Sequence, residues 1–445
     1  MIESPAGPVS SLYVHVPFCA QKCAYCAFFS EPSNAAGIDR YVASLICELE
    51  RVAADLRPQT VFFGGGTPSL LNLRQWEQIL RAMDRLRLLG AVEWTVECNP
   101  ATVSLDKARL LRDYGVNRVS LGVQSFDAAL LERLGRIHSR EMAFKSFDLL
   151  RKSGFDNVNL DLMFAIPGQT LEAWRSSLTE ATAMASEHLS SYEVIYEEDT
   201  PFYAQLQAGK LAIDEDLACE MYEELVKRAV AAGFVQYEVA NFARSNLKSE
   251  IRNPKSEGNP KSEGNPKSEI RNPESGVAAQ NPVSSSRYPE TPSTQHATGN
   301  TPPVPRPSTP LPSHACLHNV NYWRGGSFYG LGPSATSYVR GVRSKNWSNT
   351  ERYCEHLESG KRAIESKEEL QPLARAGETA AFGLRMAAGW GFEEFREITG
   401  YDLRDWGEEI RQLTECGWGQ VSSDGFKLTS QGLRFADAAA RLFLR

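Results

Sequence analysis

The chain has 445 residues, of which 42% are apolar and 23% are charged, and its 48 basic and 55 acidic side chains give a net charge of −7. This length predicts one large domain or two ordinary ones, with ample material for a core. The mild negative charge provides no general phosphate-binding field and no local basic patch stands out, so we expect no nucleic-acid partner.

The amino-terminal residues 1–11 show neither a basic start nor an apolar run, and no apolar stretch of the chain approaches the ~20 residues of a membrane-spanning helix. We therefore expect a soluble, cytoplasmic protein. The nine cysteines are an odd number in a chain without a secretion signal, which argues against a disulfide framework.

Short β-rich runs alternate with longer segments of helical period from Ser11 to about Ala240. The predicted strands are residues 12–16, 61–63, 94–97, 118–122, 157–162 and 191–195, and the helices between them include 39–56, 73–89 and 140–153. Repeated strand–helix units predict an α/β fold with a parallel sheet, here a full or partial (β/α)6 barrel. Such sheets bind ligands at the carboxyl ends of their strands.

The alternation stops after Phe242. The hexapeptide Asn-Pro-Lys-Ser-Glu-Gly occurs at 253–258 and 259–264 and starts again at 265, and residues 243–315 contain no Phe or Trp. A β-helix is the alternative reading, but the repeat has almost no apolar position to stack. We predict a low-complexity, disordered insertion at 245–314, because such a segment cannot bury enough surface to offset its ordering entropy.

The remaining chain is globular in composition. We expect a barrel core at 1–244, its continuation at 315–349, and a small α+β C-terminal domain at 350–445. The last contains predicted helices at 378–388 and 403–416, a β-ribbon at 419–428 and a final helix at 429–444.

Three cysteines lie within eight residues directly after the first strand. Cys19, Cys23 and Cys26 are spaced as C-x3-C-x2-C. Thiolates suit zinc or iron–sulfur clusters, and three of them leave one metal position for a small molecule. Structural zinc normally closes its fourth site, for which His15 is the nearest candidate. The spacing favours an iron–sulfur cluster over zinc or core cysteines.

A glycine loop follows the next strand, where residues 61–68 read VFFGGGTP. Missing side chains let backbone N–H groups approach a ligand, and a plain tight turn is the alternative.

With these features the sequence resembles the radical S-adenosylmethionine superfamily, which shares the cysteine spacing and the aromatic residue at Tyr25. The resemblance implies a 4Fe-4S cluster on Cys19, Cys23 and Cys26 whose fourth iron binds S-adenosylmethionine. It also implies cofactor contacts, through ribose hydroxyls, the methionyl amino group and the carboxylate, from Gly65, Gly66, Thr67, Glu97, Gln124, Arg136 and Asp161.

The likeness is greater to the oxygen-independent coproporphyrinogen III oxidase group of that superfamily. Segments 13–19, 161–170, 237–242 and 330–335 match this group, and the likeness covers nearly the whole chain outside the insertion. It implies that Tyr13 and Tyr25 flank the cofactor and that the C-terminal domain covers the substrate.

Two departures separate the chain from the oxidase itself. Phe28 stands where the oxidase carries a further cysteine, and only 18 residues precede Cys19. Residues 318–323 read HNVNYW, which resembles the H-N-x-x-Y-W motif of HemW-type heme chaperones. This resemblance implies heme as a further ligand, with His318 as its axial ligand, whereas the motif without the resemblance favours a capped turn whose Tyr322 and Trp323 are core anchors.

We therefore expect a heme chaperone that delivers heme to an acceptor protein, with the porphyrin-forming oxidase as the alternative. A low-potential electron donor would reduce the cluster. The sequence leaves open whether the protein catalyses a radical reaction. A homodimer stays open too, and no amphipathic basic helix supports peripheral membrane contact.

Overall fold

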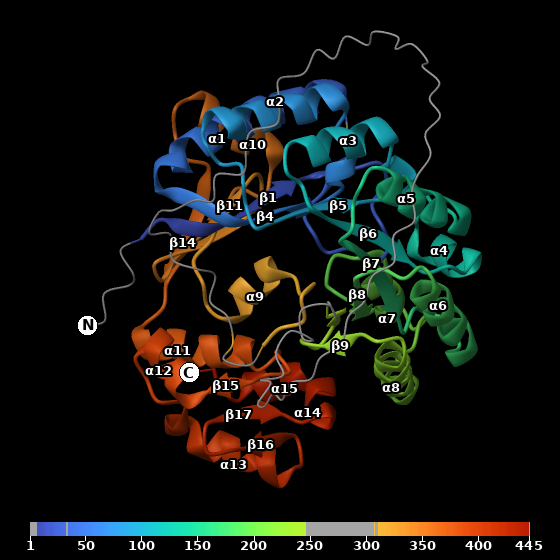
Figure 1. The fold of residues 1–445 in the computed structure, drawn as a ribbon, viewed down its shortest axis with the longest axis vertical. Helices are drawn as coiled ribbons and strands as arrows, with labels where there is room; N and C mark the ends of the chain where they lie inside the picture. The colour runs from blue at the N-terminus through green and yellow to red at the C-terminus, as the bar shows by residue number, and fades with distance from the viewer. Residues whose placement is uncertain (1–6, 33, 246–306, 308–309, 445) are drawn as a thin grey trace, which may run out of the picture. The chain divides into compact units, whose positions relative to one another are not determined.

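The computed structural model describes residues 7–32, 34–245, 307 and 310–444. Its centre is a nine-stranded sheet of order β11-β1-β4-β5-β6-β7-β8-β10-β9 (Figure 1). The strands from β11 to β8 run parallel, and β10 and β9 are antiparallel additions at one edge. Their bounds are β11 Tyr329–Leu331, β1 Val9–Val16, β4 Leu56–Gly65, β5 Glu93–Cys98, β6 Arg118–Gln124, β7 Val158–Phe164, β8 His188–Glu193, β10 Asn241–Ala243 and β9 Val235–Gln236.

Helices follow the parallel strands and cover their outer face (Figure 1). They are α1 Ala35–Val52, α2 Leu73–Arg85, α3 Leu105–Asp113, α4 Ala128–Leu134, α5 Arg140–Lys152, α6 Leu171–Ala183, α7 Pro201–Gln207 and α8 Glu215–Ala231, with 3-10 turns at Ala53–Asp55, Pro68–Leu70 and Pro100–Thr102. Local polar residues set their starts. In α2, for example, the side chain of Asn72 accepts from the Gln75 amide at 2.9 Å while Gln75 caps Asn72 in return.

The predicted α/β barrel of parallel strands is confirmed, and each predicted strand overlaps an observed one. The run predicted at 191–195 is β8, which begins three residues earlier at His188. β11 was not predicted, because it is a three-residue strand. It follows the insertion in sequence and pairs in parallel with β1, so both sides of the insertion belong to one sheet.

Glu48 ties α1 to the segments that follow the insertion. The sequence suggests a solvent-exposed face for Glu48 and Glu50, which is wrong for Glu48: it is buried, and its carboxylate accepts hydrogen bonds from Gly332 N at 2.9 Å, Tyr353 Oη at 2.7 Å and Asn346 Nδ2 at 2.7 Å. Burial raises the pKa of Glu48 above the usual carboxyl range.

The segment after β11 continues the barrel further than expected. It contains β12 Thr336–Val339, β13 Val342–Asn346, α10 Thr350–Glu358 and β14 Ile364–Glu369. β14 pairs with β13, and side chains of α10, among them Tyr353 and Leu357, join the barrel core. The expected boundary at residue 350 is therefore too early, because a separate apolar core begins only at Ala376.

The C-terminal region is a small α+β unit with its own core, as expected. It comprises α11 Pro372–Gly383, β15 Trp390–Gly391, α12 Phe392–Thr399, a 3-10 turn Leu403–Trp406, α13 Gly407–Glu415, β16 Gly419–Val421, β17 Gly425–Leu428, α14 Ser430–Arg434 and α15 Ala436–Arg441. The helix predicted at 378–388 starts earlier because Pro372 occupies the first turn, where its missing N–H costs nothing.

The insertion predicted at 245–314 lies outside the described residues except for residues 245, 307 and 310–314. Among the helices that the structure describes, none is long and apolar enough to cross a membrane.

Candidate functional site

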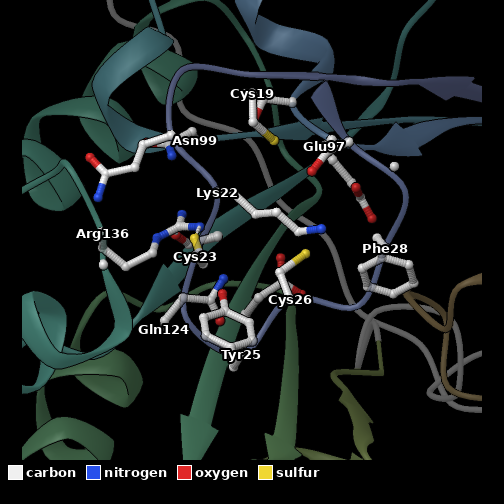
Figure 2. Close-up of a pocket in the computed structure, with 18 of the residues that line it drawn as sticks. Cys19, Lys22, Cys23, Tyr25, Cys26, Phe28, Glu97, Asn99, Gln124 and Arg136 are labelled. Carbon is white, nitrogen blue, oxygen red and sulfur yellow. Dashed lines mark hydrogen bonds between the residues drawn. The ribbon is translucent and has the colours of Figure 1, made fainter. Parts of the chain in front are cut away.

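A cavity of about 480 Å³ opens at the carboxyl ends of the parallel strands, and the three clustered cysteines line it (Figure 2). Their loop leaves β2 (Phe18–Cys19) and returns through β3 (Glu31–Pro32), which pairs with β2. It is anchored within by the Ala24 amide, which donates to Leu134 O at 3.0 Å. The predicted thiols therefore share one cavity.

The glycine loop after β4 is pressed against the start of the cysteine loop. The amides of Gly66 and Thr67 donate to Val16 O and Phe18 O, both at 2.8 Å, and a Cβ on Gly66 would lie 2.7 Å from Phe18 O. Gly65 adopts φ +105°, which favours glycine. Because both amides already have protein acceptors, a ligand ammonium would meet carbonyl oxygens or the Thr67 hydroxyl here, and the expectation that these N–H groups face a ligand is wrong.

Two carboxylates face the cavity, one from β5 and one from β7, with β6 between these strands. The side chains of Glu97 and Asp161 both line the cavity. Burial, reinforced by the Asp161 charge, raises the pKa of Glu97 to about 8. Burial raises the pKa of Asp161 to about 6, although Ser120 Oγ and Asn159 Nδ2 donate to it at 2.9 and 2.7 Å. Both groups can accept hydrogen bonds from ligand hydroxyls.

Arg136 and Gln124 approach the cysteines from the opposite wall (Figure 2). Arg136 donates to Gly122 O at 2.8 Å and its Nη1 lies 3.7 Å from Cys23 Sγ, while its buried Nε has no protein partner. Gln124 has φ +62°, a strained conformation for a residue with a side chain. Tyr25 lies beside them, and burial raises its pKa. This wall presents a cation next to the thiols.

Tyr13, like His318, does not line the cavity that the other expected cofactor residues share. Its hydroxyl donates to His15 Nδ1 at 3.0 Å, and His15 Nε2 donates to Phe29 O at 2.8 Å. Both nitrogens of His15 are thus engaged, so His15 fixes the end of the cysteine loop and offers no free nitrogen as a fourth metal ligand.

His318 lies on α9 (Leu317–Trp323), which the structure places on the inner side of the barrel strands (Figure 1). The carboxylate of Glu93 accepts from the amides of Leu317 and His318 at 2.8 and 3.0 Å and so caps this helix. The imidazole is 1% exposed and stacks on Phe62 at 5.2 Å between ring centroids.

The hydrogen bonds of His318 define its tautomer. Thr60 Oγ1 donates to Ser11 Oγ at 2.9 Å, so it accepts from His318 Nδ1 at 2.9 Å. Nε2 therefore carries the lone pair and accepts from the Tyr322 hydroxyl at 2.7 Å. Burial, and then the Arg118 charge, lower the pKa of His318 to about 3, so the ring is neutral at physiological pH.

The end of α9 contacts the C-terminal region. Phe382 packs against Trp323 with ring centroids 6.2 Å apart. The fully buried Arg324 lies 4.3 Å above the Trp390 ring and 3.3 Å from Glu394. The helix that carries His318 is therefore held by both the barrel and the C-terminal region.

The sequence alone does not identify the residues that cap α9, fix the tautomer of His318 and lower its pKa. Glu93, Thr60 and Arg118 are buried polar residues of β5, β4 and β6. Their signal is the two-residue alternation, which places Thr60 on the same strand face as Phe62 and Gly64.

Comparisons with known proteins agree with this arrangement. The family model of the radical SAM superfamily matches residues 13–181, and the HemN C-terminal domain matches residues 370–435. The barrel, with three thiols at its strand ends, is that of a radical SAM protein.

Relatives extend the likeness to the whole chain. The heme chaperone HemW of Lactococcus lactis is 30% identical over 416 residues, 93% of this chain and 90% of that protein. HemW of Bacillus subtilis is 28% identical over 98% of this chain and 99% of its own length. The chain belongs to the family of HemW heme chaperones. The solved structure of coproporphyrinogen III oxidase from Escherichia coli matches with a TM-score of 0.72 at 19% identity, over 99% of this chain and 91% of that one, which shows a shared fold.

The residues at the cavity fit a 4Fe-4S cluster with S-adenosylmethionine. Three thiols converge on one cavity, and two carboxylates and an arginine also line it. In the described part of the chain, no three His, Cys, Asp or Glu side chains are placed to hold a single metal ion. That spacing is compatible with a cluster, in which each cysteine binds a different iron atom.

Proposed function

We propose that the chain binds heme and passes it to an acceptor protein, and that it holds a 4Fe-4S cluster liganded by S-adenosylmethionine. The observation that carries this proposal is the combination of a thiol-lined cavity with a neutral, lone-pair-bearing histidine in the HNVNYW segment, in a chain related over its full length to HemW proteins. Its place of action is the cytoplasm.

The cluster is assigned to Cys19, Cys23 and Cys26. When bound, it supplies an electron for cleavage of the sulfonium of S-adenosylmethionine. Arg136 attracts anionic groups near Cys23, and Glu97 and Asp161 accept hydrogen bonds from ribose hydroxyls. Gly65, Gly66, Thr67, Gln124 and Tyr25 shape the same pocket, whereas Tyr13 acts on it through His15.

His318 is assigned as the axial ligand of heme iron. Its Nδ1–H donates to Thr60, which leaves Nε2 basic and oriented, as in metal-ligating histidines generally. Tyr322 occupies the position at Nε2 that iron would take. Ligation therefore requires the Tyr322 hydroxyl to leave Nε2 and α9 to move so that iron can reach the buried imidazole.

In this proposal the protein interacts with a heme-acceptor protein and with a low-potential electron donor. It works as a homodimer. The choice between chaperone and oxidase depends on chemistry at the cavity.

One anaerobic reaction tests that choice. Reconstituted protein is incubated with S-adenosylmethionine, a low-potential reductant and coproporphyrinogen III, and the products are chromatographed. We expect 5′-deoxyadenosine with unchanged coproporphyrinogen. Formation of protoporphyrinogen would instead make the chain an oxidase.

A variant keeps the result interpretable. Cys26→Ser removes one thiolate and should abolish both cluster and deoxyadenosine formation. Deoxyadenosine that persists in this variant would contradict the assignment of the cluster.

A further inference from the structure

Four large apolar side chains stand exposed around the mouth of the thiol-lined cavity. Their exposed fractions are 69% for Phe28, 60% for Ile195, 43% for Ile137 and 42% for Tyr192, and all four line the cavity. Exposed apolar residues gathered at one opening mark a binding surface, whereas scattered ones need no explanation. We call these four residues the apolar rim.

The apolar rim is assembled from separate segments. Phe28 belongs to the cysteine loop, where Figure 2 shows it beside Cys26 and Glu97 at the edge of the cavity. Ile137 directly follows Arg136, and Tyr192 and Ile195 lie at the end of β8 and just beyond it. A ligand that contacts all four must therefore extend across the opening.

Charge around the opening is divided between its two sides. Lys22, on the cysteine loop, is exposed and lines the cavity, while Glu193 and Glu197 stand on the β8 side. An anionic group on the ligand is attracted at Lys22 and repelled on the β8 side. The surface thus distinguishes two edges of a bound molecule.

We propose that the apolar rim is a docking site for the tetrapyrrole macrocycle, with its propionates directed to Lys22 and its vinyl edge to Ile195. This inference rests on the proposed heme function and adds a second, accessible site to it. A flat, largely apolar ring with two carboxylates on one edge matches both the apolar rim and its charge division. The enclosed His318 ring, with both nitrogens engaged, cannot receive heme until α9 opens.

The probe is metal-free protoporphyrin IX, which has no iron for His318 to bind. Its fluorescence is titrated with the full-length, cluster-reconstituted protein. Phe28→Ser and Ile195→Ser should each weaken binding about tenfold, because each removes a large apolar contact. Lys22→Glu should weaken it as well, since it reverses the charge at the propionates.

Ile213→Ser is the matched control, because Ile213 is 52% exposed and does not line the cavity. Its affinity should equal that of the unaltered protein. Iron content is measured in each variant to verify that the cysteine loop still holds its cluster.

Unchanged porphyrin affinity in Phe28→Ser and Ile195→Ser would overturn the docking site, and so would heme binding without porphyrin binding. If the unaltered protein binds neither molecule, the proposed function itself fails. Heme binding that depends on His318 alone would retain that function and remove only this inference, including the case in which an acceptor protein occupies the apolar rim instead.

Discussion

Under the proposed ligation of heme iron by His318, the Tyr322 hydroxyl competes with iron for the lone pair of Nε2, so its removal should strengthen heme binding. Tyr322→Phe deletes the 2.7 Å hydrogen bond to Nε2 and keeps the aromatic ring, which packs against Phe328 with centroids 4.4 Å apart. The Thr60 bond at Nδ1 is untouched, so the tautomer is preserved.

The size of the effect follows from the value of one hydrogen bond. A typical hydrogen bond contributes about 1 kcal/mol net to stability. In Tyr322→Phe, iron binding to Nε2 no longer has to break this hydrogen bond. The dissociation constant should therefore fall about fivefold. It is measured by titrating the reconstituted protein with heme and following the Soret absorption.

Tyr329→Phe is the control, because it removes another tyrosine hydroxyl, bonded to Asp55 at 2.8 Å, away from His318. Its heme affinity should not change. If Tyr322→Phe binds heme no more tightly than Tyr329→Phe, Nε2 of His318 is not the iron ligand and the assignment is refuted.

Three further results are expected. Heme affinity should stay the same from pH 8 to pH 6, because the lowered pKa of His318, about 3, keeps the ring neutral. A histidine with an ordinary pKa of about 6.5 would lose affinity roughly fourfold over this range. Heme titrations at each pH distinguish the two outcomes. Glu48→Ala leaves three buried donors without the Glu48 carboxylate and should lower the free energy of unfolding by about 3 kcal/mol or more, measured by thermal unfolding. Glu50→Ala on the same helix removes an exposed ion pair with Arg85 and should lower it by less than about 1 kcal/mol. Equal losses in the two variants would contradict the role of Glu48. Replacing Arg324 with Ala leaves the largely buried Glu394 without this cation and should destabilise the protein by about 3 kcal/mol, and an unchanged melting temperature would argue against that contact.

Local patterns were enough to predict the parallel strands and the cysteine loop, and the family resemblance added the other expected residues that line the cavity. The carboxyl ends of parallel strands meet at one edge, so polar residues such as Glu97 and Asp161 come together once the strands are found. The cysteine spacing acts within one loop and needs no long-range information.

Contacts across long sequence separations were beyond the same reasoning. Thr60 and His318 are 258 positions apart, and Glu48 meets Tyr353 across 305. No periodicity connects such pairs, so the sequence predicts an exposed Glu48 and a C-terminal boundary before α10. Nor does the sequence reveal that His318 is enclosed, because the motif does not specify the hydrogen-bond partners of its histidine.

The most direct test of the heme assignment compares the unaltered protein with His318→Ala in one heme titration, with the cluster followed by electron paramagnetic resonance after reduction. We predict a saturable Soret band of histidine-ligated heme in the unaltered protein, the loss of that band in His318→Ala even where heme still docks at the apolar rim, and the same cluster signal in both. The same histidine-ligated Soret band in the two proteins, with the cluster intact, would contradict heme ligation by His318.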